Sequence, residues 1–225
     1  MPIGLTVGAR GYKGFSLTPY EGGSKTNIVT VLNVPNASDP AQKETIMHPA
    51  VKRLTELVTP SGPHRSRDWP VVERALGAAL PTDYRQLVET YGGGVFGETV
   101  WLLDPACPDD DYELLAQAAE RAETLKKLWE VEPRPAQLQE SGTEVLPWAY
   151  IEGTGAMLYW LVKPGQEPDE WTVMSNEGRG PLWEHHDAQC ASFLLTVLTG
   201  RAETDHFPAL AVDQHQFDSN DEILG

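Results

Sequence analysis

The sequence has few cysteines. Only Cys107 and Cys190 occur among its 225 residues, and they lie far apart. Nothing about two distant cysteines demands a disulfide, so a reducing, cytoplasmic location is the simpler prediction.

Long apolar runs are also lacking. No stretch is long enough to cross a membrane. The first fifteen residues, MPIGLTVGARGYKGF, do not combine a charged start with a continuous apolar segment, so no signal peptide is predicted. We therefore expect a globular protein without a membrane partner.

Basic residues are scarce. There are 17 lysines and arginines against 33 aspartates and glutamates, which gives a net charge of −16. This balance argues against a protein that holds the phosphate backbone of a nucleic acid. It suits a partner that is itself basic, although acidity that merely aids solubility explains the composition equally well.

Residue patterns typical of catalysis are missing as well. The sequence has no G-x-S-x-G nucleophile elbow, and neither cysteine lies in a catalytic context. In the segment GGSKT (22–26), Ser24 interrupts the G-K-[ST] end of a phosphate loop, and no good helix follows. We predict no catalytic residues, no cofactor and no enzyme activity.

The segment Glu184–Asp187, EHHD, is the best candidate for a metal site. Adjacent histidines on a strand point to opposite faces, so they do not readily bind one ion. No H-E-x-x-H or Cys/His spacing accompanies them. We predict that this segment is a strand end that leads into a helix cap, without a metal.

The stretch 76–103 organises the rest of the chain. Pro81 suits a first helical turn, and apolar residues then recur at helical spacing from Tyr84 to Tyr91. Three glycines (92–94) end this helix, and an extended segment follows. We expect Gly92 or Gly93 to adopt a positive φ.

Periodicity and capping residues predict the other elements. Helices are expected from Pro49, from Asp68 as N-cap, over 112–129 after Asp109–Asp111, and over 188–199 with Asp187 as N-cap. Strands are expected over 145–152, 156–162, 171–175 and 182–185, as a meander.

Several of these segments together resemble one known family. They are the pattern LPxDYRxLxxxYGGGxF followed by WLLxP, then LPWA (146–149), LYW (158–160), EWTV (170–173) and SFLL (192–195). In order and spacing they are similar to the SUKH superfamily of Smi/Knr-like domains, over residues 51–208. The resemblance implies an α+β fold with helices on a mixed, largely antiparallel sheet in a single domain. Bacterial members are mostly immunity proteins that bind a toxin, and fungal relatives are interaction hubs in cell-wall signalling.

Composition divides the chain into three parts. Residues 1–47 are predicted to be a poorly ordered extension, in which Asn27–Val34 could form one strand. Residues 48–210 are predicted from the resemblance to form the SUKH-like domain. Residues 211–225 are predicted to be an acidic, flexible tail, since no lysine or arginine follows Arg201.

The predicted function is therefore binding. The resemblance implies an immunity protein that neutralises a toxin, such as a nucleic-acid-directed enzyme, and the alternative is a regulatory adaptor of the Smi/Knr type. Acidic groups would steer a basic partner and aromatic groups would anchor it. Side chains alternate along a strand, so one of Tyr159 and Trp160 should face outward. The predicted partner surface contains Glu152, Tyr159, Trp160, Glu170 and Glu184.

Overall fold

A computed structural model describes residues 46–62, 66–178, 180–206 and 215–225, all within one structural unit, Thr45–Gly225. The predictions for the first 45 residues, including the strand Asn27–Val34 and the GGSKT loop, lie outside the described residues.

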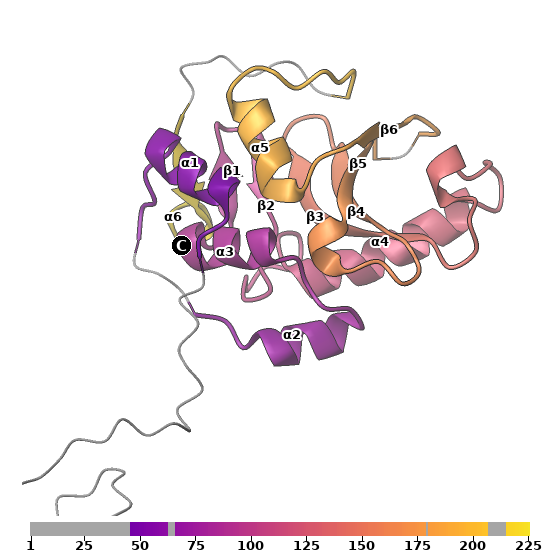
Figure 1. Cartoon of the computed structure of the whole chain (residues 1–225), viewed down its shortest axis with the longest axis horizontal. Helices are drawn as coiled ribbons and strands as arrows, with labels where there is room; N and C mark the ends of the chain where they lie inside the picture. Colours follow the sequence, from indigo (N-terminus) through magenta and orange to yellow (C-terminus); the bar gives the residue numbers. More distant parts are fainter. Residues whose placement is uncertain (1–45, 63–65, 179, 207–214) are drawn as a thin grey trace, which may run out of the picture. The chain divides into compact units, whose positions relative to one another are not determined.

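The seven described strands form one sheet in which every neighbouring pair is antiparallel (Figure 1). Their order is β6-β5-β4-β3-β2-β1-β7, so six strands form a meander in chain order and the last one returns beside β1. The strands are β1 (Gly94–Phe96), β2 (Val100–Leu102), β3 (Glu144–Ile151), β4 (Met157–Val162), β5 (Thr172–Asn176), β6 (Trp183–His186) and β7 (Phe217–Ser219).

Six α-helices accompany this sheet in the described ranges, which confirms the predicted α+β class. They are α1 (Pro49–Leu57), α2 (Trp69–Leu76), α3 (Thr82–Tyr91), α4 (Leu114–Leu128), α5 (Cys190–Leu198) and α6 (Asn220–Leu224). Two short 3-10 turns lie at Ala136–Leu138 and Pro168–Glu170. Among these helices, none combines the length and the apolarity needed to span a bilayer.

Local capping predicted some helix ends correctly. The Asp68 carboxylate accepts a hydrogen bond from the Val71 N–H (3.3 Å) at the start of α2, and α3 ends at Gly92 with φ 77°. The N-cap of α4 is Glu113, whose carboxylate accepts from the Ala116 N–H (2.6 Å), so this helix begins two residues later than predicted from Asp109–Asp111.

The predicted N-cap of the last helix, Asp187, is wrong. The helix begins after Gln189, and its first turn is capped by a residue of α3. The buried Asp83 carboxylate accepts a hydrogen bond from the Ala191 N–H (2.8 Å) and from the Cys190 thiol (3.2 Å). A cap supplied from 108 positions away leaves no signal in the local sequence.

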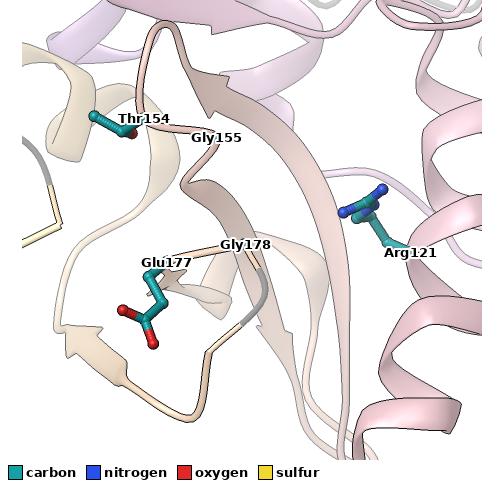
Figure 2. A pocket seen from close by; sticks show the side chains of 5 residues that line it. All are labelled: Arg121, Thr154, Gly155, Glu177 and Gly178. Atoms are coloured by element: carbon teal, nitrogen blue, oxygen red, sulfur yellow. The ribbon is translucent and has the colours of Figure 1, made fainter.

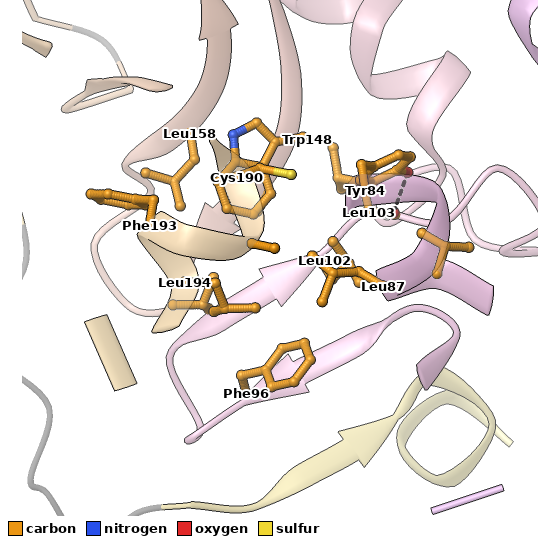
Figure 3. Close-up of a cluster of buried hydrophobic side chains, with 14 of the residues drawn as sticks. Tyr84, Leu87, Phe96, Leu102, Leu103, Trp148, Leu158, Cys190, Phe193 and Leu194 are labelled. Atoms are coloured by element: carbon orange, nitrogen blue, oxygen red, sulfur yellow. Dashed lines mark hydrogen bonds between the residues drawn. The ribbon is translucent and has the colours of Figure 1, made fainter. Parts of the chain in front are cut away.

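The larger core lies between one face of the sheet and helices α1, α3 and α5. Figure 3 shows side chains of α3, α5 and the strands within it. The Tyr84 ring meets the Trp160 ring edge-on, with centroids 4.9 Å apart, and the Tyr84 hydroxyl donates to the Leu103 carbonyl (2.7 Å). This bond satisfies a buried polar group in an otherwise apolar layer.

A second, smaller core covers the opposite face of the sheet beneath α4. Its buried members include Leu125 of α4, Leu138 of the first 3-10 turn, Tyr159, and Met174. The central strands are therefore covered on both faces, which explains why β4 is a continuous apolar run without alternation.

The C-terminal residues 215–225 complete the sheet, so the prediction of a flexible tail is wrong for them; residues 211–214 lie outside the described ranges. Phe217 of β7 packs against Phe96 and Tyr91, at centroid distances of 4.6 and 5.1 Å. Asn220 is buried, and its side-chain oxygen accepts from the Trp101 indole N–H (2.9 Å). The prediction from acidic composition missed Phe217 and Asn220, whose side chains pack into the fold.

Candidate functional site

Two of the residues predicted for the partner surface are buried. Tyr159 is 1% exposed and Trp160 is 0% exposed. Trp160 faces the core formed with α3 and α5, and Tyr159 faces the core beneath α4. The expectation that one of them faces outward is wrong because helices cover both faces of β4.

The three predicted carboxylates lie in different places. Glu152 is exposed in the turn between β3 and β4, whereas Glu170 is exposed in the connection between β4 and β5. Successive turns of a meander lie at opposite ends of the sheet, so these two residues are not neighbours. Glu184 lies on β6, directly opposite Ser175 of β5.

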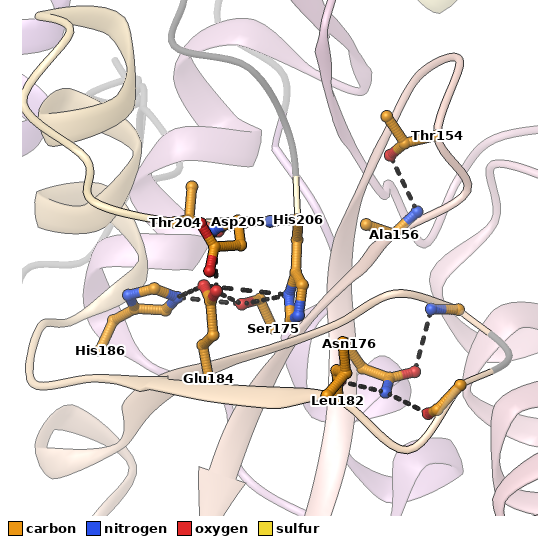
Figure 4. A network of polar contacts seen from close by, with 12 residues as sticks. Thr154, Ala156, Ser175, Asn176, Leu182, Glu184, His186, Thr204, Asp205 and His206 are labelled. Carbon is orange, nitrogen blue, oxygen red and sulfur yellow. Dashed lines mark hydrogen bonds and ion pairs between the residues drawn. The ribbon is translucent and has the colours of Figure 1, made fainter.

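Glu184 belongs to a compact polar cluster with Ser175, His186 and His206 (Figure 4). The Ser175 hydroxyl lies 3.0 Å from His186 Nε2, 2.9 Å from His206 Nδ1 and 3.4 Å from Glu184 Oε2. The second Glu184 oxygen accepts from the Asp205 N–H (2.8 Å). The cluster therefore fastens the residues around 204–206 to the edge of the sheet.

Burial and hydrogen bonding shift the pKa values in this cluster. Desolvation lowers the pKa of His186 below 6.5, against the opposing attraction of Glu184. Desolvation by itself would raise the pKa of Glu184. Hydrogen bonds from the Thr204 side chain and the Asp205 N–H, together with the nearby histidines, lower it below 4.5 overall.

The hydroxyl at the centre of this cluster is inaccessible to solvent. Ser175 is 0% exposed, so its hydroxyl cannot meet a substrate. Its oxygen also occupies the centre toward which the two imidazoles and the carboxylate point. The described residues include no group of three or more His, Cys, Asp or Glu side chains placed to hold a metal ion.

An accessible concave surface lies on the other face of the sheet, beside the N-terminal half of α4. Two adjoining hollows of about 410 and 260 Å³ share Arg121 and Gly155 in their lining. We call them together the α4 recess. It is lined by Asp111, Tyr112, Gln117, Glu120, Arg121, Tyr150, Thr154, Gly155, Met157, Glu177 and Gly178.

Two hairpin turns shape the wall of the recess that faces α4. Figure 2 shows Arg121 projecting from the helix toward the turn that carries Thr154 and Gly155. The turn after β5 approaches this turn so closely that a Cβ on Gly178 would overlap the Gly155 carbonyl oxygen. Gly178 also has φ 85°, so only glycine suits the position.

Three aromatic rings stack beside the recess. The Trp101 ring lies 4.1 Å from Tyr112 and 5.8 Å from Tyr150, at interplanar angles of 21° and 6°. The Tyr150 hydroxyl donates to Glu152 Oε2 (3.1 Å), and burial raises the pKa of Tyr150, which keeps this donor protonated. Glu152 does not itself line the recess, but of the five residues predicted for the partner surface it is the one that bonds to the lining residue Tyr150.

The charged groups of the lining are mostly acidic. Asp111, Glu120 and Glu177 carry negative charge, and Arg121 is the one positive residue among the lining residues. Arg121 Nη2 pairs with Glu120, while its buried Nε has no partner among the described residues. The recess therefore combines ring faces with excess negative charge.

Sequence reasoning missed Tyr112 and Tyr150. Trp101 and Tyr150 are directly paired across β2 and β3 and so lie on one face of the sheet, but the register of this pair cannot be read from the sequence. Nothing local could have placed Tyr112, which reaches them from the loop before α4.

Within the described ranges, the structure thus consists of a helix-covered antiparallel sheet that carries the polar, aromatic α4 recess. The chain matches no family model, no curated protein and no solved structure. The SUKH resemblance therefore remains a prediction from the sequence motifs.

Proposed function

We propose that this chain is a non-catalytic binding protein of the immunity type, which occupies and neutralises a basic toxin protein. The observation that carries the proposal is the α4 recess, where tyrosine rings and carboxylates share one accessible hollow. Tyrosine is enriched among the residues that dominate binding energy, and complementary charge speeds association and selects partners.

Two further observations support the proposal. The net charge of −16 suits a partner of opposite sign. The SUKH-like motifs cover most of the chain, and the observed fold class is the one that the resemblance implies. A cationic toxin, such as one that acts on nucleic acid, is the partner that this combination favours.

The test begins with capture of a partner from the native cells by cross-linking at the recess. The captured protein is then expressed alone and together with the chain. We expect arrested growth when it is expressed alone and restored growth when both are present. A partner that binds but never affects growth would contradict the immunity role and favour the regulatory adaptor.

Charge-reversal variants connect this result to the surface. Glu120→Lys places a positive charge in the recess, whereas Glu144→Lys makes the same change at the exposed start of β3, at the other end of that strand from Glu152. We expect loss of rescue with Glu120→Lys and full rescue with Glu144→Lys. Equal rescue by both variants would exclude the recess as the toxin-binding surface.

A further inference from the structure

We propose that the α4 recess receives an arginine side chain of the bound protein, which contacts the tyrosine rings and donates hydrogen bonds to the carboxylates. The inference rests on the proposed function only in that the arginine belongs to a partner. The chemistry of the recess can be tested on the chain alone.

The ring faces supply the first part of the argument. Tyr112 and Tyr150 both line the recess, with ring centroids 6.0 Å apart and planes inclined by 28°. Both side chains are only half-buried. A cation is attracted to the face of a tyrosine ring, and a planar guanidinium can also stack on it.

The carboxylates supply the second part. Asp111 and Glu120 line the same hollow as the two tyrosines, and Glu177 lines the adjoining one. Asp111 and Glu120 are both exposed. The Glu120 oxygens already accept from Arg121 Nη2 and from Gln117 Nε2 (3.3 Å), whereas no described residue donates to the Asp111 carboxylate. Asp111 therefore offers its lone pairs to an arginine of the partner, and Glu120 adds negative charge beside it. A guanidinium can donate two parallel hydrogen bonds to one carboxylate, which an ammonium group cannot do. The combination of ring and carboxylate therefore favours arginine over lysine.

Arg121 favours the alternative, an anionic ligand, because its buried Nε lacks a partner among the described residues and could bind an anion. However, its Nη2 is already paired with Glu120. The remaining carboxylates of the lining would repel an anion, and the net charge of the whole chain would oppose its approach. The balance of charge thus points to a cationic guest.

The test uses small probes and the full chain. N-acetyl-arginine amide is titrated while amide signals are followed by ¹H–¹⁵N NMR. N-acetyl-citrulline amide serves as the uncharged control of nearly the same shape, and N-acetyl-glutamate amide is the anionic arm. We expect saturable shifts at Tyr112, Gln117 and Gly155 with the arginine probe, and at least about tenfold weaker binding of the other two.

Two variants with opposite expected effects sharpen the test. Glu120→Gln should weaken the arginine probe by about threefold to fivefold, the effect of one exposed ion pair. Arg121→Gln removes the like charge and should strengthen it, provided that a thermal melt shows the fold intact. Glu144→Gln, outside the recess, should leave the affinity unchanged.

Several outcomes would overturn the inference. They are equal binding of the citrulline probe, preferential binding of the glutamate probe, and no saturable shift up to about 100 mM, where even millimolar affinities saturate. Because the probes need no partner, arginine binding without growth rescue would refute the immunity role alone. Rescue without arginine binding would refute this inference alone.

Discussion

At the scale of single residues, two buried carboxylates join segments that are distant in the sequence. Asp83 of α3 caps the first turn of α5. Asp104 binds Arg67 through two contacts of 3.0 and 2.6 Å and also accepts from the Gly93 N–H (3.0 Å). Charge-assisted bonds of this kind are stronger than neutral ones, and they fix geometry as well as energy. The glycine break after α3 is therefore held by side-chain chemistry in addition to backbone conformation.

The last of the three glycines after α3, Gly94, gives a prediction about adding one methyl group. Gly94 has φ 151°, and a Cβ there would lie 2.7 Å from Phe217 Cζ and overlap the Asp218 carbonyl oxygen. We expect Gly94→Ala to lower the free energy of unfolding by about 3 kcal/mol, because rigid neighbours must move. Urea unfolding measures the loss.

Gly153→Ala is the matched control. Gly153 has φ 77°, but nothing lies within 4 Å of its hypothetical Cβ. The strained backbone alone should cost about 1 kcal/mol. Similar losses in the two variants would show that β7 does not approach Gly94 as closely as the structure indicates.

At the scale of elements, the sequence predicted what depends on local pattern. Helical spacing from Tyr84 to Tyr91 predicted α3, and Pro81 and Gly92 marked its two ends within a residue. The pattern could not show that α4 covers the face of β4 opposite α5, so the burial of Tyr159 was missed. Nor could it show that a polar segment after residue 214 supplies a strand. Both facts depend on contacts between distant segments.

The C-terminal strand gives the second prediction. Phe217→Ala removes a ring that packs against Tyr91 and Phe96, and we expect a loss of about 3 kcal/mol in the free energy of unfolding. Ile223→Ala changes an apolar side chain that is 43% exposed in the adjacent α6, and its effect should stay within about 0.5 kcal/mol. Thermal and urea unfolding compare the two. Equal, small effects would mean that β7 contributes nothing to the core.

The polar cluster around Ser175 gives a prediction about how stability depends on pH. The folded pKa of His186 is lowered, so the unfolded chain binds more protons and stability falls as the pH drops below about 6.5. The pKa of Glu184 is also lowered, so a second loss follows below about 4.5, on protonation of its carboxylate. Both contributions are fully present at neutral pH. Urea midpoints at several pH values from about 8 to 4 measure them.

His186→Gln separates this effect from the many other acidic groups. The variant should lose less stability than the wild type between pH 7.5 and 5.5. His185→Gln is the control, because His185 is exposed on the opposite face of β6, where it bonds to Thr172 (2.9 Å). Identical pH profiles for all three proteins would show that His186 is not the group that titrates.

At the scale of the whole molecule, the negative charge is spread over the chain, whereas the concave aromatic surface is confined to the α4 recess. Residues 1–46 contain four basic and three acidic residues, so residues 47–225 carry −17. The recess contributes only part of this charge, through Asp111, Glu120 and Glu177. Long-range attraction therefore belongs to the whole surface, whereas close fit belongs to the rings and carboxylates of one hollow.

This separation predicts different effects of salt on the two rate constants of partner binding. Exposed charges are screened over about 8 Å at physiological ionic strength, so added salt should lower the association rate. We expect a decrease of about tenfold between 50 and 500 mM salt, measured by surface plasmon resonance against the identified partner. The dissociation rate should change much less, because it depends on contacts that are already desolvated.

Tyr112→Leu should have the opposite effect to salt: it should raise the dissociation rate and leave the association rate nearly unchanged. An association rate that does not depend on salt would remove electrostatic steering from the account and leave the recess as the sole source of selectivity.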